Sequence, residues 1–210
     1  MNVLVFGASG GTGRELVKQG LEQGHSLTAF VRNPASFEIK HANIKMVKGD
    51  ITDYASVERA VEGHAAVMSA LGASTVLRRE PAFTAGARNI VKAMEQAGVR
   101  RFIYLSALTV RAVRDQLNFL GRYVIAPIVL RNVAADHEAN ERIIEQSRLD
   151  WTIVRPPRLT NGERTGVYRS GERIDSKAII PEISRADLAE FMLKQLVDDT
   201  FLRRAACVMY

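Results

Sequence analysis

Short apolar runs alternate along this chain with longer stretches in which apolar residues recur at helical spacing. Uninterrupted apolar runs are typical of strands that are buried on both faces, as they are in parallel sheets. The predicted strands are Val3–Phe6, Ser26–Val31, Ile44–Lys48, Ala66–Ala70, Arg101–Ser106 and Trp151–Arg155, with Ala205–Met209 as a final edge strand. The predicted helices are Thr12–Gln23, Ala55–Val61, Ala82–Ala97, Ala135–Ser147 and Ser184–Leu196. This alternation predicts an α/β fold, in which a doubly wound parallel sheet carries helices on both faces.

Residue types at the helix ends agree with this pattern. Gly24 and Gly98 follow two of the predicted helices, and glycine is the residue that most easily adopts the conformation ending a helix. Ser184 is predicted to cap the last helix, with Asp187 as its acidic partner in the first turn.

The most informative segment joins the first strand to the first helix and places glycines at Gly7, Gly10 and Gly13. The first allows a tight turn, the second lets a pyrophosphate approach the backbone, and the third lets the helix lie close to the strand. Free N–H groups and the helix dipole then attract the anion. A coincidental turn is the alternative, but the strand-loop-helix context favours a dinucleotide site of the Rossmann type. Its predicted contacts are Gly7, Ser9, Gly10, Gly11, Thr12 and Gly13.

Two charged residues at strand ends bear on which dinucleotide binds. Arg32 ends the second strand, where a protein that prefers NAD usually has an acidic residue for the ribose hydroxyls. A guanidinium can instead pair with a 2′-phosphate, so NADPH is the predicted cofactor, with an ordinary surface arginine as the alternative. Asp50 ends the third strand, where it can meet the adenine amino group or form an N-cap or Asx turn. The remaining predicted contacts on this side are Ile51, Leu71 and Gly72.

Residues at the ends of the later strands are candidates for contacts with the nicotinamide and the hydride acceptor. Ser106 ends the fifth strand, where its hydroxyl can bond the carboxamide, a substrate oxygen or its own backbone. Pro156 begins a rigid loop that can wall the nicotinamide or simply end the sixth strand. His137 lies near the start of a helix and is either a donor in the same pocket or a surface residue.

One frequent catalytic pair is missing from the sequence. Enzymes of this architecture that oxidise alcohols usually carry Tyr-x-x-x-Lys, in which the lysine lowers the pKa of the tyrosine so that it donates a proton. Tyr104 and Tyr123 have Leu108 and Pro127 at the lysine position. We therefore expect an acceptor that needs no strong acid, such as a flavin or a quinone, rather than a simple ketone.

The length of 210 residues fits one nucleotide-binding domain, residues 1–210, and leaves no room for a separate substrate domain of ordinary size. Loops of the same unit, at residues 108–134 and 156–183, are therefore predicted to hold the substrate. The first loop contains the apolar run Tyr123–Leu130, which is too short to cross a bilayer and is predicted to form a lid or a subunit contact.

Composition and charge narrow the expected setting. Hydrophobic residues make up 47% of the chain and charged residues 25%, with no recognisable signal peptide, so a cytoplasmic protein without membrane contact is expected. The net charge of +6 comes from scattered basic residues, so a small molecule rather than nucleic acid is the expected partner. Cys207 is predicted to be a buried structural thiol, and the histidines lack metal-ligand spacing. Both a monomer and a small homo-oligomer fit these features.

Several motifs, taken in order, resemble a known family. They are Phe6–Gly13, Val31-Arg32, Gly49-Asp50, Leu71-Gly72, Gly86–Val91, Ser106-Ala107, Asp136-His137 and Pro156-Pro157. Over nearly the whole chain they resemble the atypical short-chain dehydrogenase/reductases of the biliverdin-IXβ reductase, or flavin reductase, group, which has NmrA-like sensors as relatives. The resemblance implies an NADPH-dependent reductase of flavins and tetrapyrroles, with Ser106 and His137 lining the substrate pocket. Arg158 departs from the mammalian enzyme, which has histidine there, and a contact between Arg158 and an anionic acceptor such as FMN is expected.

Two functions from different classes fit these observations. The first is an NADPH-dependent oxidoreductase that transfers hydride to a conjugated acceptor, such as a flavin, a quinone or a linear tetrapyrrole. The second is a redox sensor or regulatory protein that binds NADP(H) without turnover, because the missing tyrosine–lysine acid suits both. An epimerase or another sugar-nucleotide enzyme is disfavoured by the same missing acid and by the small C-terminal part.

Overall fold

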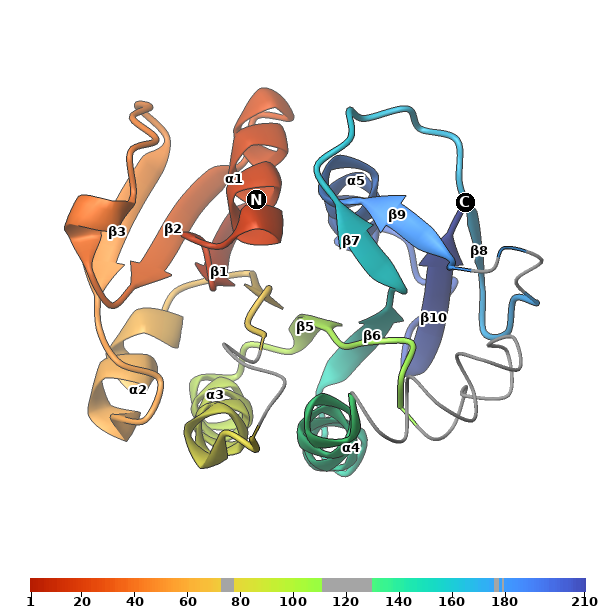
Figure 1. Cartoon of the computed structure of the whole chain (residues 1–210). Coiled ribbons are helices and arrows are strands. Elements are labelled where there is room, and N and C mark those ends of the chain that lie inside the picture. The colour runs from red at the N-terminus through yellow and green to blue at the C-terminus, as the bar shows by residue number, and fades with distance from the viewer. Residues whose placement is uncertain (73–77, 111–129, 176–177, 179) are drawn as a thin grey trace.

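The centre of the protein is an eight-stranded sheet with the strand order β3-β2-β1-β4-β5-β6-β10-β8 (Figure 1). The computed structural model describes residues 1–72, 78–110, 130–175, 178 and 180–210. The strands are β1 (Asn2–Phe6), β2 (Ser26–Val31), β3 (Ile44–Lys48), β4 (Ala66–Ser69), β5 (Arg101–Leu105), β6 (Asp150–Arg155), β7 (Arg158–Thr160), β8 (Arg169–Gly171), β9 (Glu182–Ser184) and β10 (Arg204–Met209). Within the large sheet, β8 pairs antiparallel with β10 and the other neighbours pair parallel. The short strands β7 and β9 form a separate parallel pair.

Helices cover both faces of the sheet. They are α1 (Gly11–Glu22), α2 (Tyr54–Val61), α3 (Pro81–Ala97), α4 (Arg131–Glu145) and α5 (Arg185–Lys194), with a short 3₁₀ helix, η1 (Pro34–Ser36), after β2. Figure 1 shows α1 and α5 on one face and α2, α3 and α4 on the other. The strand order reverses between β1 and β4, which is the position where open α/β sheets bind ligands at the carboxyl ends of their strands.

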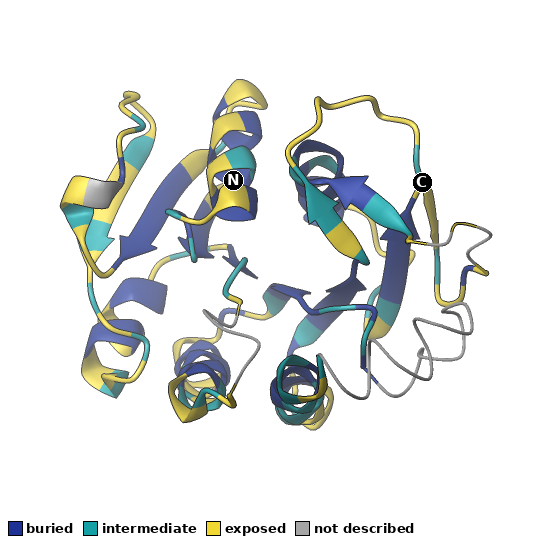
Figure 2. Ribbon diagram, viewed as in Figure 1, coloured by how far each residue is buried: buried dark blue, intermediate teal, exposed yellow. Residues whose placement is uncertain are grey.

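The core explains why the strands are continuous apolar runs. Val3, Leu4, Val5 and Phe6 of β1 are completely buried because side chains from both faces of the strand meet helices. Val3 and Val5 belong to the apolar cluster beneath α1 and α5, and Leu4 and Phe6 belong to the cluster beneath the other three helices. Figure 2 shows this buried sheet between helices whose outer faces are exposed.

The structure confirms the predicted fold class and most of the predicted boundaries. The first six strands begin and end within one residue of the predicted positions. Gly98 ends α3 with a φ of 69°, and the Ser184 hydroxyl accepts a hydrogen bond of 2.9 Å from the Asp187 N–H at the start of α5. Helix α4 begins at Arg131, earlier than the predicted Ala135, so the His137 side chain belongs to the second turn.

The C-terminal part of the sheet differs from the prediction. Residues 204–209 form β10, which lies between β6 and β8 and is therefore not an edge strand. The edge is β8, whose sequence Arg169-Ser170-Gly171 has no apolar residue and therefore gave no strand signal. The strands β7, β8 and β9 each contain three residues, and they are held by their partners in the sheet rather than by their own propensity.

Cys207 of β10 is buried, as predicted. Among the described residues, no helix combines the length and the apolar character that crossing a bilayer requires. The predicted lid or subunit contact falls almost entirely within residues 111–129, which lie outside the described part of the chain.

Candidate functional site

The turn between β1 and α1 has the geometry of a phosphate cradle. Gly7 has a φ of +76°, and a Cβ there would lie 2.7 Å from the Ala70 carbonyl carbon. A Cβ on Gly13 would lie 2.0 Å from the Gly7 oxygen, so only glycine lets α1 approach the strand this closely. The first turn of α1 contains no acidic residue, and its N–H groups and dipole present positive charge. The residues present therefore fit a dinucleotide pyrophosphate.

A cavity of about 440 Å³ lies beside this turn, at the carboxyl ends of β1, β2, β3 and β4. Predicted cofactor contacts dominate its wall: Gly7, Ser9, Gly10, Arg32, Asp50, Ile51, Leu71 and Gly72. We call it the adenine-side cavity. Phe30, Thr52, Glu80, Ala82 and Phe83 also line it, and the sequence analysis did not single them out.

Arg32 and Asp50 face the adenine-side cavity together. The Asp50 Oδ1 atom accepts hydrogen bonds from the Thr52 backbone N–H at 2.8 Å and from its hydroxyl at 2.7 Å. These two bonds, assisted by the charge of Arg32, hold the pKa of Asp50 below its ordinary value. The Asx turn expected as an alternative is therefore formed, while Asp53 is the N-cap of α2. No described residue donates a hydrogen bond to Asp50 Oδ2, and the contact with adenine stays a prediction.

A second cavity, of about 410 Å³, adjoins the first because Ala70, Leu71 and Gly72 line both. We call it the acceptor-side cavity. Besides Leu71 and Gly72, it brings together five further predicted site residues, namely Gly11, Thr12, Ser106, His137 and Pro156. The two cavities follow the carboxyl edge of the sheet across the point where the strand order reverses, as an extended dinucleotide requires.

Ser106 is anchored by a buried ion pair. Its hydroxyl donates a hydrogen bond of 2.6 Å to Glu141 Oε1. Arg155 binds both oxygens of the same carboxylate, at 3.0 Å from Nε and 2.8 Å from Nη2. Burial lowers the pKa of Arg155, but the hydrogen bond and charge of Glu141 more than offset this, so the pKa of Arg155 is raised. Ser106 is therefore not free to donate to a substrate oxygen, which was one of the roles considered from the sequence.

His137 is buried rather than a surface residue, which removes the alternative given for it above. Burial lowers the pKa of His137 to about 4, although the charge of Asp136 acts in the opposite direction, so the imidazole is neutral near pH 7. Its Nδ1 atom lies 3.2 Å from the Tyr104 hydroxyl oxygen, which also accepts a hydrogen bond of 3.0 Å from Asn140 Nδ2. Burial raises the pKa of Tyr104, which therefore keeps its proton and cannot act as a general acid.

Two arginines, Arg158 of β7 and Arg185 of α5, differ in their position relative to the cavities. Arg158 pairs with Glu182, its side chain is 62% exposed, and it lines neither cavity. Its predicted contact with an anionic acceptor stays a prediction. Arg185, which the sequence analysis missed, lines the acceptor-side cavity and donates a hydrogen bond of 2.6 Å to Asn161 Oδ1. A Cβ on Gly11 would lie 2.7 Å from Arg185 Cδ and Nε, so the arginine rests on the first residue of α1.

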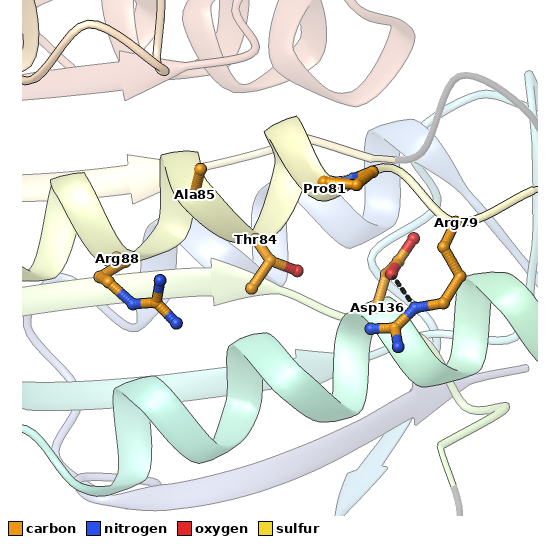
Figure 3. Close-up of a pocket in the computed structure, with 6 residues that line it drawn as sticks. All are labelled: Arg79, Pro81, Thr84, Ala85, Arg88 and Asp136. Atoms are coloured by element: carbon orange, nitrogen blue, oxygen red, sulfur yellow. Dashed lines mark hydrogen bonds and ion pairs between the residues drawn. The ribbon is translucent and has the colours of Figure 1, made fainter.

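A third cavity, of about 400 Å³, lies between α3 and α4 and contains none of the predicted site residues (Figure 3). Asp136 lies in its wall and binds Arg79 Nε at 2.7 Å and the Glu80 backbone N–H at 2.8 Å. Since Glu80 also lines the adenine-side cavity, this contact ties the segment before α3 to α4 and supports that cavity from outside.

Two of the residues that the sequence analysis missed, Glu141 and Arg155, are charged and yet buried. Ala134, His137, Glu141 and Ile144 recur at helical spacing on the buried face of α4. That spacing was a usable signal, because it places His137 and Glu141 on the same face as two apolar residues.

The glycine turn, the reversal of strand order and the two adjoining cavities define a dinucleotide-binding protein of the Rossmann type. The family described as NAD(P)H-binding matches residues 7–199, and the chain belongs to this family. The predicted nicotinamide cofactor class is thereby confirmed, without a distinction between NADP and NAD.

Individual proteins resemble the chain over most of its length. UPF0659 protein YMR090W of Saccharomyces cerevisiae is 31% identical, and the match covers 94% of this chain and 87% of the yeast protein. Photosystem II assembly factor Ycf39 of Synechocystis sp. is 26% identical over 97% of this chain, which spans only 61% of that protein. The solved structure of ChuY, an anaerobillin reductase from Escherichia coli O157:H7, has a TM-score of 0.78 at 20% identity, covering 99% of this chain and 96% of its own. This last likeness shows a shared fold.

Proposed function

We propose that the protein is an NADPH-dependent reductase that passes hydride to a conjugated small molecule, namely a flavin, a quinone or a linear tetrapyrrole. The observation that carries the proposal is the pair of adjoining cavities. One has Arg32 in its wall and suits the adenosine half of the cofactor, and the other has Ser106 and His137 and suits the nicotinamide and the acceptor. Cytoplasmic location and a small-molecule partner without nucleic acid belong to the same proposal.

Arg32 supports NADPH over NADH. Its guanidinium is exposed at the end of β2 and lines the adenine-side cavity beside Asp50. A 2′-phosphate bound there would receive charge-assisted hydrogen bonds, whereas the unmodified ribose of NADH would gain no comparable charge interaction.

The chemistry of the acceptor-side cavity supports a conjugated acceptor. NADPH supplies a hydride, so the acceptor gains two electrons and then takes a proton from solvent. Tyr104 is fully buried with a raised pKa, and His137 is neutral near pH 7, so neither group is a strong acid toward a ligand. A flavin, quinone or tetrapyrrole delocalises the arriving charge and does not need such an acid, whereas a simple ketone does.

Two of the similar proteins point to different activities. ChuY is an anaerobillin reductase and shares the fold, which favours reduction of a tetrapyrrole-like acceptor. Ycf39 is an assembly factor, which favours the alternative of a regulatory protein that binds NADP(H) without turnover. The missing tyrosine–lysine acid suits both, so turnover itself must be measured.

The test is a screen of NADPH and NADH oxidation with riboflavin, FMN, quinones and linear tetrapyrroles, with cyclohexanone as the acid-requiring control. The proposal expects steady oxidation of NADPH by at least one conjugated acceptor and none by the ketone. Tight NADPH binding without oxidation by any acceptor would establish the regulatory alternative instead.

A further inference from the structure

Glu141 fixes whether the Ser106 hydroxyl donates or accepts hydrogen bonds on its cavity side. A serine hydroxyl has one hydrogen, and Ser106 donates it to Glu141 Oε1 at 2.6 Å. The carboxylate has no hydrogen to return, because it forms an ion pair with Arg155, whose guanidinium donates to both of its oxygens. Glu141 and Arg155 are both buried, so this arrangement is shielded from water. Toward the acceptor-side cavity, the Ser106 oxygen is therefore only an acceptor of hydrogen bonds.

Tyr104 fixes which ring nitrogen of His137 carries the hydrogen, and this gives His137 the opposite role, that of a donor. The Tyr104 oxygen accepts from Asn140 Nδ2, so its own hydrogen needs a different partner. Among the described residues, His137 Nδ1 is the acceptor in reach, at 3.2 Å. A neutral imidazole that accepts at Nδ1 carries its hydrogen on Nε2. Within the described part of the chain nothing accepts a hydrogen bond from His137 Nε2–H, which is therefore a donor for a ligand.

We propose that Ser106 and His137 together recognise an amide, with Ser106 accepting from its N–H group and His137 donating to its carbonyl oxygen. Both residues line the same cavity, and their opposite polarities match the two groups of an amide edge. Glu141 and Tyr104 are the positioning residues, because Glu141 fixes the position of the hydroxyl hydrogen of Ser106 and Tyr104 fixes which nitrogen of His137 carries its hydrogen. Two ligands supply this chemistry, namely the carboxamide of the nicotinamide and the N–H/C=O edge of a flavin or a tetrapyrrole lactam. Recognition of a flavin or lactam edge rests on the function proposed above, whereas recognition of the nicotinamide carboxamide does not.

The arrangement predicts discrimination against ligands that lack the N–H group. An acetyl group in place of the carboxamide would put a methyl against Ser106, which cannot turn its own hydrogen outward without leaving Glu141. A lost hydrogen bond of this kind corresponds to a weakening of about 3- to 10-fold in binding.

The first test measures binding alone, by calorimetry, and needs no turnover. The dissociation constants of NADP⁺ and of its 3-acetylpyridine analogue are compared in the parent protein, in Ser106→Ala and in Ser69→Ala. Ser69 is the matched control, since it is a buried serine at the end of the neighbouring strand β4 and lines neither cavity. If Ser106 contacts the carboxamide, the dissociation constant of the analogue is about 3- to 10-fold higher than that of NADP⁺ in the parent and in Ser69→Ala. In Ser106→Ala the two dissociation constants are nearly equal.

The second test applies the same comparison to the acceptor, using lumiflavin and its N3-methyl derivative bound to the NADP⁺ complex. A preference for lumiflavin that disappears in Ser106→Ala assigns the amide to the acceptor. If neither the cofactor pair nor the flavin pair shows a ratio that depends on Ser106, the proposed recognition is overturned, whether or not the protein turns over.

The third test observes His137 directly by NMR of protein labelled with ¹⁵N-histidine, with the His137→Gln variant identifying its signals. The proposal expects a neutral imidazole with hydrogen on Nε2 at pH 7, and a shift toward the Nδ1–H form in Tyr104→Phe. A predominant Nδ1–H form in the parent protein would remove the donor and contradict the proposal.

Discussion

Arg155 holds both carboxylate oxygens of Glu141, at 3.0 Å and 2.8 Å, with both side chains buried beneath the acceptor-side cavity. The pair joins α4 to β6, and it places a fixed negative charge behind Ser106. A buried ion pair is costly to break on one side only, because the remaining charge stays desolvated without a partner.

Stability measurements should show this asymmetry. Glu141→Leu or Arg155→Met alone is expected to lower the free energy of unfolding by about 3–5 kcal/mol, since each leaves one buried charge unpaired. The double variant removes both charges and is expected to lose less than either single variant. Urea unfolding of the three variants measures the coupling, and single-variant losses below about 1 kcal/mol would show that the pair is not desolvated as described.

Two glycines of the phosphate turn should respond to substitution in different ways. A Cβ on Gly13 would collide with the Gly7 oxygen at 2.0 Å, so Gly13→Ala is expected to destabilise the fold. A Cβ on Gly10 comes within 3.3 Å of the same oxygen, and Gly10 lines the adenine-side cavity, where a larger side chain would take up ligand space. Gly10→Val is therefore expected to remain folded by circular dichroism and to lose NADPH binding. If Gly10→Val bound NADPH as tightly as the parent, the pyrophosphate would have to lie elsewhere.

Arg32 should distinguish NADPH from NADH. Arg32→Ala is expected to raise the dissociation constant of NADPH by an amount corresponding to about 1.5–3 kcal/mol, because a charge-assisted interaction is lost, and to leave that of NADH nearly unchanged. Arg59→Ala is the control, since it removes the same charge from an exposed position on α2. Equal affinities of the parent protein for the two cofactors would argue against this role.

Arg185 should act on both cofactors alike. It rests on Gly11 at the positive end of α1, and among the described residues no carboxylate pairs with it. Two positive groups in contact favour an anion between them, and the pyrophosphate is common to NADPH and NADH. Arg185→Ala is therefore expected to weaken both by about 10-fold, as measured by fluorescence titration. A loss confined to NADPH, or a loss of FMN binding alone, would place Arg185 at a different group.

Local signals account for the parts of the site that the sequence could predict. The Gly7, Gly10 and Gly13 spacing reports a backbone geometry that is fixed within a few residues of chain, and the strand ends follow from apolar runs. Arg32 and Asp50 could be placed because each lies within two residues of the end of a strand, and both line the same cavity.

Longer-range contacts account for what the sequence could not predict. The pairing of Glu141 with Arg155 could not be predicted, because only the packing of α4 against β6 brings the two side chains together. Ser106 could be placed at the cavity, but whether its hydroxyl donates or accepts there depends on Glu141, a residue on a different element. Arg185 was missed for a similar reason, since its proximity to Gly11 arises only from the packing of α5 beside α1.

The central claim is that the two adjoining cavities bring NADPH and a conjugated acceptor together for hydride transfer. Anaerobic rapid mixing of the NADPH-loaded protein with riboflavin, a quinone or a linear tetrapyrrole tests it most directly. We expect oxidation of bound NADPH at a rate that saturates with one of these acceptors and that is absent in Gly10→Val. Bound NADPH that stays reduced with every acceptor, in a protein that binds it tightly, would contradict the claim.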